Sequence, residues 1–439
     1  MKVYIETLGC PKNTVDSHAM EALLFNGGHI VVNDPEEAEV LIVNTCAFIK
    51  DAKEESIESI FDLAEQKAAS GKKLLVTGCL AQRYAAELYQ EMPEVDAFLG
   101  VNDYQNLNDI INKVSAGRRV SSVHEAPPLF DELNGRRGTA GEVSSYLRIA
   151  EGCDNACTYC IIPSIRGPYR SRRMEDIIAE AEQLASEGTK ELILIAQDVS
   201  AYGRDLYGDL ALHRLLRKLC RIEGIHWIRL LYCYEDSITD ELIETIRSEE
   251  KICHYIDIPL QHINDRILME MNRHSTTASI RETVSRLRAS IPDIHIRTTF
   301  ITGFPGESDE EFGELEEFVE EMCFERLGVF AYSQEEDTPA AEMPDQIDEE
   351  VRAGRANAIM AIQQEISLAL NQKKKGSVIE VLVEESNGDG TFNGRTAYDA
   401  PEIDNGVIFI SEKELTPGEF VKVKVTDAFD YDLTGIVVD

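Results

Sequence analysis

The sequence predicts an α/β protein of three consecutive domains: a doubly wound parallel sheet, a partial (β/α)6 barrel like an incomplete TIM barrel, and a small antiparallel β-barrel. Apolar runs alternate with amphipathic helical patterns along most of the 439 residues, which is typical of parallel sheets. The alternation pauses in a stretch rich in Gly, Pro and Arg, and five short strand-like runs replace it near the end. The predicted domains are therefore 1–128, 142–371 and 372–439, with a linker at 129–141.

The composition indicates a globular and strongly acidic protein. Apolar residues make up 43% of the chain, and 80 acidic against 43 basic side chains give a net charge of −37. Such a negative field repels phosphate backbones and attracts basic proteins. A generally acidic proteome would account for the net charge equally well. Ten cysteines are too sparse for a disulfide framework, and their grouping favours metal in a reducing compartment. Because no leader pattern or membrane-length apolar run is present, we expect a cytoplasmic protein without membrane contact.

The first domain is predicted from three apolar runs that resemble buried parallel strands and that each end at a cysteine. Helical patterns separate them, and a further helix closes the domain. The runs are Val3–Cys10, Val40–Cys46 and Leu74–Cys79, and the helices are Val15–Phe25, Lys53–Ala69, Gln82–Gln90 and Asp103–Val114. Ligands of such sheets gather at the carboxyl ends of the strands. We therefore expect Cys10, Cys46 and Cys79 to converge into a three-thiolate site, although each alone would suit a buried structural thiol.

The second domain opens with three cysteines at C-x3-C-x2-C spacing, Cys153, Cys157 and Cys160, on the loop after a short apolar strand. Three thiolates can hold three corners of a cubane iron–sulfur cluster, which normally takes four cysteines. One iron would then keep an open position, as catalytic metals do. A zinc knuckle or chance clustering of thiols is the alternative, but a zinc site of this kind needs a fourth Cys or His nearby, and the nearest histidines are His124 and His213.

The remainder of the second domain repeats helix and strand until six βα units are counted, two short of a closed TIM barrel. The strands are predicted at 144–150, 191–197, 227–232, 255–261, 294–303 and 327–332, and the helices at 174–187, 210–222, 238–249, 276–291, 308–322 and 346–375. Polar residues lie on or directly after these strands, among them Gln197, Gln261 and Arg297. Polar residues end most strands, so a binding role and an ordinary strand end stay open for each. For Cys220, Cys233, Cys253 and Cys323 a core position is favoured.

Four arginines within eight residues follow the cysteine loop, from Arg166 to Arg173. In an acidic protein such a cluster needs anionic neighbours. Arg166 and Arg170 are candidates for binding the carboxylate of a substrate or cofactor through bidentate hydrogen bonds. Pairing with the acidic helix that begins near Glu175 is the structural alternative.

The last domain contains five strand-like runs, 377–384, 391–398, 406–410, 419–425 and 433–438, with a hairpin signal at Asn387–Gly390. Five short strands in under 70 residues suggest a small closed barrel. From Gln372 onward there are seven basic and fourteen acidic residues, a net charge of −7. An RNA-binding barrel should be basic to neutralise phosphates. The expected partner is therefore a positively charged protein and not tRNA.

Motifs in all three domains resemble the radical S-adenosylmethionine (SAM) methylthiotransferase family. The C-x3-C-x2-C loop with Tyr159 before its last cysteine resembles the radical SAM superfamily, and the final barrel resembles the TRAM domain. In the first domain the similar motifs are Leu8-Gly-Cys-Pro-Lys-Asn13, Asn44-Thr-Cys-Ala47 and Thr77-Gly-Cys-Leu-Ala-Gln82.

The resemblance implies SAM and two 4Fe-4S clusters as cofactors of a transferase. Cys153, Cys157 and Cys160 would hold the cluster that splits SAM into methionine and a 5′-deoxyadenosyl radical. Cys10, Cys46 and Cys79 would hold an auxiliary cluster that carries the sulfur. Gln197 lies where the superfamily binds the SAM amino group, and Gln261 lies where ribose hydroxyls are bound; Arg297 is a further SAM candidate. The clusters and SAM carry the chemistry, so no side-chain nucleophile is expected.

Three motifs are similar to the ribosomal-protein branch of the family: residues 8–13, 157–167 and 398–404. That branch adds a methylthio group to the β-carbon of an aspartate in the twelfth protein of the small ribosomal subunit. It implies that basic protein, an electron donor such as flavodoxin or ferredoxin, and a sulfide source as partners. A tRNA adenosine methylthiotransferase is the runner-up, although its isopentenyl branch should carry Gly-Cys-Gln-Met-Asn where this chain has Pro11-Lys12. A non-catalytic iron–sulfur carrier is the alternative of another class.

Overall fold

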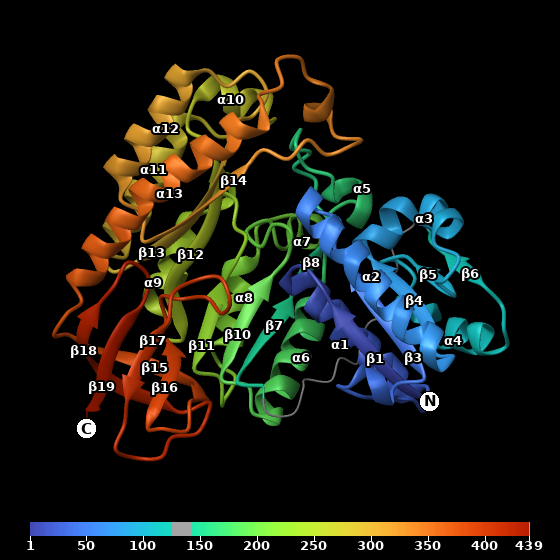
Figure 1. Cartoon of the computed structure of the whole chain (residues 1–439). Helices are drawn as coiled ribbons and strands as arrows, with labels where there is room; N and C mark the ends of the chain where they lie inside the picture. Colours follow the sequence, from blue (N-terminus) through green and yellow to red (C-terminus); the bar gives the residue numbers. More distant parts are fainter. Residues whose placement is uncertain (125–141, 439) are drawn as a thin grey trace.

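The computed structural model describes residues 1–124 and 142–438, which form two six-stranded sheets, a closed five-stranded barrel and a two-stranded ribbon. The first sheet and its helices lie on one side of the second sheet, and the closed barrel lies near the amino ends of the second sheet's strands (Figure 1). The linker predicted at 129–141 lies outside the described residues. None of the described helices has the length and apolar character that crossing a bilayer requires.

The first sheet is parallel throughout, with strand order β2-β1-β3-β4-β5-β6. Its strands are β1 (Lys2–Thr7), β2 (Ile30–Val31), β3 (Val40–Thr45), β4 (Lys73–Gly78), β5 (Ala97–Leu99) and β6 (Val120–Ser122), and its helices are α1 (Pro11–Asn26), α2 (Lys50–Ser70), α3 (Cys79–Glu91) and α4 (Leu107–Ser115). All six residues of β3 are buried, as a central parallel strand covered on both faces requires. The strand order reverses direction between β1 and β3, where doubly wound sheets bind ligands.

The second sheet pairs its strands strictly in chain order, all parallel, as the predicted partial barrel requires. The strands are β7 (Ser144–Arg148), β10 (Glu191–Ile195), β11 (Trp227–Leu230), β12 (Ile252–Gln261), β13 (His295–Thr302) and β14 (Arg326–Ala331). The long helices are α6 (Met174–Glu187), α8 (Leu212–Leu219), α9 (Asp240–Ser248), α11 (Thr277–Ser290), α12 (Asp309–Met322) and α13 (Glu349–Gln372). Short elements that the sequence patterns do not predict are β8 (Ala150–Glu151), β9 (Arg170–Ser171), α5 (Ile162–Arg166), α7 (Arg204–Tyr207) and α10 (Asp265–Glu270).

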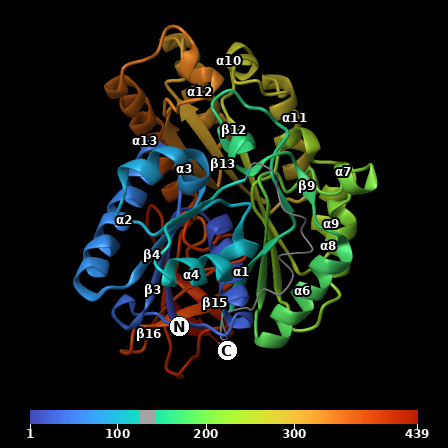
Figure 2. The same cartoon turned by 90° about the vertical axis from the view of Figure 1, so that its right-hand side faces the viewer.

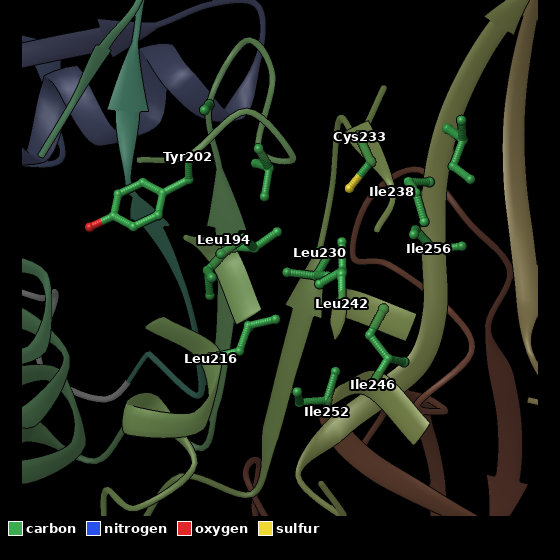
Figure 3. Packing of buried hydrophobic residues seen from close by; sticks show 14 of the residues in the cluster. Leu194, Tyr202, Leu216, Leu230, Cys233, Ile238, Leu242, Ile246, Ile252 and Ile256 are labelled. Atoms are coloured by element: carbon green, nitrogen blue, oxygen red, sulfur yellow. The ribbon is translucent and has the colours of Figure 1, made fainter. Parts of the chain in front are cut away.

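The helices α6, α8, α9 and α11 cover the outer face of the second sheet, opposite to the first domain (Figure 2). Alternate strand residues such as Leu194, Leu230 and Ile256 point to this face and pack against Leu216 of α8 and Leu242 of α9 (Figure 3). The intervening residues, such as Ile193 and Ile195, belong to a different core on the inner face. The period of two along each strand therefore divides the sheet into a helix-covered side and an inner side.

The inner face is filled from both ends by the other domains. Val15 of α1 and Leu382 of the closed barrel pack in one cluster with Trp227 and Tyr255 of the second sheet. The closed barrel also supplies Asp404, whose carboxylate accepts a hydrogen bond of 2.6 Å from the Tyr255 hydroxyl. The incomplete barrel thus buries its concave side by using residues from both neighbours.

The C-terminal barrel consists of β15 (Val378–Ser386), β16 (Thr391–Arg395), β17 (Val407–Ile410), β18 (Phe420–Ala428) and β19 (Leu433–Val438), and it closes in the order β15-β16-β17-β19-β18. The predicted closed five-strand barrel is confirmed, with one difference. The pair β17–β19 is parallel, whereas the other pairs are antiparallel. A closed ring cannot have every neighbouring pair antiparallel when its strand number is odd, so one parallel pair is unavoidable.

The four cysteines outside the two predicted metal sites differ in exposure. Cys233 and Cys253 are buried, as expected of core thiols, and Cys220 is half-buried. The prediction of a core position is wrong for Cys323, which is exposed. Cys323 ends α12 with φ of +47°, and its thiol donates to the Glu320 carbonyl at 3.0 Å, so the turn that ends the helix directs it away from the core.

Candidate functional site

Cys10, Cys46 and Cys79 follow the three adjacent strands β1, β3 and β4 at their carboxyl ends. Cys10 precedes α1, Cys46 begins the loop after β3, and Cys79 is the first residue of α3. Gly9 has φ of +90°, and a Cβ there would come within 2.9 Å of the Cys46 sulfur. The glycine therefore lets the loop that carries Cys10 lie directly against Cys46. The structure brings these thiols together as the sequence predicts.

The thiols of Cys10 and Cys79 lie close enough to Cys46 to affect its pKa. Burial, and then Cys79 and Cys10, raise the pKa of Cys46 to about 12. Burial also raises the pKa of Cys79, which Arg166 opposes from 3.4 Å. Neutral thiols in such a place become thiolates when a metal binds and supplies positive charge.

Cys153, Cys157 and Cys160 lie on a loop closed at its base by the antiparallel pair β8–β9. Gly152, with φ of +80°, lies so close to this base that a Cβ would meet the Pro168 carbonyl oxygen at 2.1 Å. The loop is then held by two backbone hydrogen bonds, from the amide of Cys153 to the Gly167 carbonyl at 3.2 Å and from that of Cys160 to the Cys157 carbonyl at 3.1 Å.

The thiols of the loop are also within electrostatic range of one another. Burial raises the pKa of Cys153 to about 11 and that of Cys160 to about 12, with Cys157 adding to both shifts. The Cys157 sulfur lies 2.8 Å from the Tyr234 hydroxyl. The guanidinium of Arg273 lies 3.9 Å from the centre of the Tyr234 ring and pairs with Glu235 at 3.0 Å. The Cys157 sulfur therefore has a hydroxyl partner whose ring is also held by Arg273.

A buried polar network joins the two sets of cysteines. Asp16 of α1 pairs with Arg148 at 2.5 Å and with Arg166 at 2.7 Å. Arg148 also pairs with Glu151 at 2.8 Å, and Glu151 accepts a hydrogen bond of 2.6 Å from Gln197. Burial opposes the charge of Arg148, yet Asp16 and Glu151 keep its pKa above the ordinary value. The network fixes the first domain against the strand that leads into the cysteine loop.

Helix α5, which directly follows the cysteine loop, lies beside α3, the helix that begins at Cys79 (Figure 1). Lys12, two residues after Cys10, is within electrostatic range of Cys10 and lowers the pKa of Cys160. Its ammonium stands 3.4 Å from the centre of the Tyr232 ring. We call the group of Cys10, Lys12, Cys160, Arg166 and Tyr232 the junction.

The donor sets fit iron–sulfur chemistry. In residues 1–124 and 142–438, no three His, Cys, Asp or Glu side chains converge closely enough to hold one metal ion. A four-iron cluster spreads its thiolates around a cube, so it requires looser spacing than a single ion does. Each set offers three cysteines on loops that glycines allow to approach closely, and an all-thiolate set is the donor chemistry that such clusters take.

The predicted SAM-binding residues lie in different surroundings. Gln197 joins the network through Glu151, and its Oε1 is buried without a partner among the described residues. Gln261 ends β12 with φ of +71°, an uncommon conformation for a residue other than Gly. Arg297 pairs with Asp257 at 3.1 Å and with Asp404 of the C-terminal barrel at 3.4 Å. The structure therefore brings Gln197 to the cysteine loop and Arg297 to the interface with the barrel; their binding roles stay predictions.

The two arginines predicted to bind a carboxylate are both close to the loop. Arg166 is buried and donates to Asp16 and to Asn13, the latter at 3.0 Å. Arg170 donates to the carbonyls of Pro168 at 2.9 Å and Arg166 at 3.2 Å, and burial lowers its pKa. Carboxylates of the protein itself thus occupy Arg166, while a substrate role for either arginine stays a prediction.

Sequence reasoning missed several residues of the site: Lys12, Asp16, Arg148, Glu151, Tyr232 and Tyr234. The only available signal was spacing. Asn13 and Asp16 are one helical turn apart directly after Cys10, so both face the same side of α1. Nothing in the spacing indicates that Tyr234 contacts Cys157, because 77 residues separate them.

The chain matches three family profiles in order. These are the uncharacterized protein family UPF0004 over residues 2–100, the radical SAM superfamily over residues 147–319 and the TRAM domain over residues 376–438. The first range contains Cys10, Cys46 and Cys79, and the second contains the cysteine loop. The radical SAM match implies SAM and a 4Fe-4S cluster as cofactors.

Curated relatives match the whole chain. The ribosomal protein uS12 methylthiotransferase RimO of Clostridioides difficile is 49% identical, covering 100% of this chain and 99% of the relative. The protein of the same name from Lachnoclostridium phytofermentans is 51% identical over 99% of each chain. A solved structure of the radical SAM methyltransferase TsrM from Kitasatospora setae shares the fold at 13% identity, with a TM-score of 0.57 over 88% of this chain and 79% of TsrM.

Proposed function

Because the chain belongs to the family of ribosomal protein uS12 methylthiotransferases called RimO, we propose that it transfers a methylthio group to the β-carbon of an aspartate in uS12. The proposal is supported by identity near 50% over the full length and by the three matching profiles in order. The division into domains at 1–128, 142–371 and 372–439 with a linker at 129–141 belongs to the same proposal.

The observation that carries the proposal is that a buried polar network joins the domains of two three-cysteine sets. A non-catalytic carrier has no need for a second three-cysteine set, nor for a buried network that joins the two domains. In this network Asp16 of the first domain forms ion pairs with Arg148 and Arg166 of the second domain. A sulfur held at one set would then face the reacting carbon held near the other.

We assign the residues as follows. Cys153, Cys157 and Cys160 hold the cluster that binds SAM, and Cys10, Cys46 and Cys79 hold a second cluster. When bound, the clusters and SAM supply the carbon radical chemistry that abstracts hydrogen from an unactivated C–H bond, together with the sulfur and the methyl group. Tyr234 orients Cys157, and Glu151 orients the amide of Gln197 so that its Oε1 is free to accept a hydrogen bond from the amino group of SAM.

The C-terminal barrel is proposed to bind the substrate protein. Its net charge of −7 opposes phosphate backbones and favours a basic ribosomal protein, which electrostatic steering would bring to the enzyme. A low-potential electron donor such as flavodoxin or ferredoxin and a source of sulfide complete the proposed partners. The reaction would take place in the cytoplasm, where ribosomal proteins are made.

Iron content tests the two cysteine sets. Anaerobically reconstituted protein should bind about eight iron atoms per chain, as two four-iron clusters require. The triple Ala variant at Cys153, Cys157 and Cys160 should keep about four and should lose both SAM binding and 5′-deoxyadenosine formation. The control variant Cys323→Ala removes an exposed thiol outside both sets and should keep the full iron content. SAM cleavage by the triple variant would refute the assignment.

Mass spectrometry of uS12 and of tRNA tests the substrate. In cells that lack this chain, a mass increment for one methylthio group should disappear from a single aspartate of uS12, while methylthio-adenosines in tRNA persist. Restoring the chain should restore the increment. Loss of a tRNA modification with unchanged uS12 would replace the proposal by the tRNA branch of the family.

A further inference from the structure

Lys12 is a cation without an anionic partner in the centre of the junction. Among residues 1–124 and 142–438 its ammonium forms neither an ion pair nor a hydrogen bond, and it stands over the Tyr232 ring, 3.4 Å from the ring centre. The side chain is partly buried. A cation–π contact supplies part of the interaction that an ammonium loses on leaving water, but it leaves the three N–H donors unsatisfied.

The other cations around the junction are neutralised by the protein itself. Arg148 and Arg166 share Asp16 and Glu151, which gives two positive and two negative charges. Arg297, farther along the inner face of the sheet, is paired with Asp257 and Asp404. Glu151 and Asp257 act on Lys12 only from beyond ion-pair distance. Unlike Arg148, Arg166 and Arg297, Lys12 therefore has no carboxylate within ion-pair distance among the described residues.

Tyr232 holds the ammonium in place through an unusual backbone conformation. It follows β11 with φ of +63°, which is strained for an aromatic residue, and its amide donates to Asp257 Oδ2 at 2.9 Å. Strain of this kind persists where the surrounding structure fixes it, and it clusters at binding sites. The result is a fixed ring on one side of the Lys12 ammonium, which leaves its other sides open to a further partner.

The position of Lys12 is accessible to a ligand from outside. Cys10, Cys153 and Cys160 are each partly exposed, unlike Cys46, Cys79 and Cys157, which are buried. Lys12 is within electrostatic range of Cys10 from the first set and of Cys160 from the second. A group bound to its ammonium would therefore lie between the two cysteine sets.

We propose that Lys12 binds the side-chain carboxylate of the substrate aspartate and thereby selects an acidic residue. The inference deepens the proposed function and rests on it. An ammonium donates charge-assisted hydrogen bonds to a carboxylate, and a neutral amide in the same position would leave the cation unpaired. Because the β-carbon is one bond from that carboxylate, the contact also holds the reacting carbon between the two sets. Lys12 is a substrate-binding and specificity residue, with no role in proton transfer.

The first test uses the unaltered protein. Reconstituted protein is titrated, by fluorescence anisotropy, with a labelled uS12 peptide centred on the aspartate that mass spectrometry identifies, and with the same peptide carrying Asn or Glu there. The Asp peptide should bind about tenfold more tightly than the Asn peptide, as loss of one charge-assisted hydrogen bond implies. The Glu peptide, whose carboxylate is one methylene farther out, should bind but should not be modified. Equal affinity for Asp and Asn would overturn the inference.

The second test locates the discrimination at Lys12. Lys12→Met should bind the Asp peptide about tenfold more weakly and the Asn peptide unchanged, whereas Lys12→Arg should retain most of the preference. Lys50→Met is the matched control, since it removes an equal charge from an exposed side chain of the same domain and should leave the preference intact. Iron content is measured for every variant. The inference is wrong if Lys12→Met still binds the Asp peptide more tightly than the Asn peptide. It is also wrong if Lys12→Met loses iron and Lys12→Arg fails to bind the Asp peptide.

These outcomes separate the inference from the proposed function. Failure of the unaltered protein to bind or modify any uS12 peptide or intact uS12 would refute the proposed function and the inference together. Modification of the aspartate with no dependence of binding on Lys12 would refute the inference alone.

Discussion

The buried ion-pair network of Glu191 should be the main polar attachment of the C-terminal barrel to the second sheet. Glu191 begins β10 and is fully buried. It accepts from Arg229 of β11 at 2.8 Å, from Ser144 of β7 at 2.8 Å, and from Arg395 of the closed barrel. Both arginines are buried, so one carboxylate serves two cations from different domains. The informative substitution is Glu191→Gln, which keeps the shape and removes the charge.

The magnitude follows from the charges that the substitution leaves behind. Removing one partner of a buried pair costs about 3–5 kcal/mol, because the remaining charge is no longer compensated. Here two guanidinium groups lose the Glu191 carboxylate. Arg395 keeps its pair with Glu384 at 2.6 Å, and Arg229 keeps its bonds to the Thr396 and Ala397 carbonyls. We therefore expect a loss of about 3 kcal/mol or more. With an m-value of about 1.5 kcal/mol per molar urea, the midpoint of barrel undocking should fall by about 2 M.

The only tryptophan reports directly on this interface. Trp227 lies on β11 and contacts Phe420 of the closed barrel, with ring centroids 4.8 Å apart. Its fluorescence during urea titration therefore follows undocking, which global probes would mix with unfolding of the other domains. The matched control is Glu380→Gln, which breaks the exposed pair of Glu380 with His226 across the same interface, with side chains 49% and 44% exposed. That pair should contribute under about 1 kcal/mol.

A shift of the Trp227 transition by less than about 0.5 M in Glu191→Gln would contradict the reasoning. So would equal shifts in Glu191→Gln and Glu380→Gln, because burial is the feature that separates the two pairs. Far-UV circular dichroism of both variants without urea would show whether the sheets remain intact.

Three further predictions follow from the same contacts. Acid should weaken the barrel interface. Arg229 and Arg395 overcome the effect of burial and lower the pKa of Glu191 to about 2, against 4.5 in the unfolded chain. The contribution of Glu191 to stability is therefore complete above pH 4.5 and is lost as the pH falls towards 2. Trp227 fluorescence against pH should show this loss, and Glu191→Gln should lack it. Tyr234→Phe removes the hydroxyl beside the Cys157 sulfur, and it should lower the reduction potential of the cluster held by the cysteine loop by about 20–60 mV in an EPR titration. An unchanged potential would show that the hydroxyl does not donate a hydrogen bond to the Cys157 sulfur. Binding of uS12 should weaken as salt rises, and substitution of acidic residues on the barrel surface should reduce this dependence, while salt-independent binding would exclude electrostatic attraction.

The architecture could be predicted because its signals are local. Parallel strands buried on both faces read as continuous apolar runs, and the helices between them carry a regular apolar stripe. The cysteine loop was predictable for the same reason, since three thiols within eight residues must meet wherever the loop goes. The strands β2, β5 and β6 have only two or three residues each, too few to show a period, and none was predicted.

The network between the cysteine sets could not be predicted because its partners are far apart in sequence. Asp16 meets Arg166 across 150 residues, and Arg395 meets Glu191 across 204. An arginine patch after the cysteine loop suggested an external anion, and the sequence could not show that Asp16 of the first domain would already be bound to Arg166. Lys12 is the complementary case, a cation beside the first cysteine whose missing partner only the assembled structure reveals.

The inner face of the incomplete barrel explains why the three domains must be present together. A six-stranded sheet leaves its concave side open, and apolar residues such as Trp227 and Tyr255 would otherwise meet water. At the amino ends of the strands, segment 396–404 of the C-terminal barrel covers these apolar residues. Asp399 of this segment is bound to Arg326, and Asp404 is bound to Tyr255. Nearer the carboxyl ends α1 brings Val15 and, one turn earlier, Lys12. The barrel segment therefore covers the amino-end part of the inner face, and Lys12 of the first domain lies at the opposite end, against Tyr232 after β11.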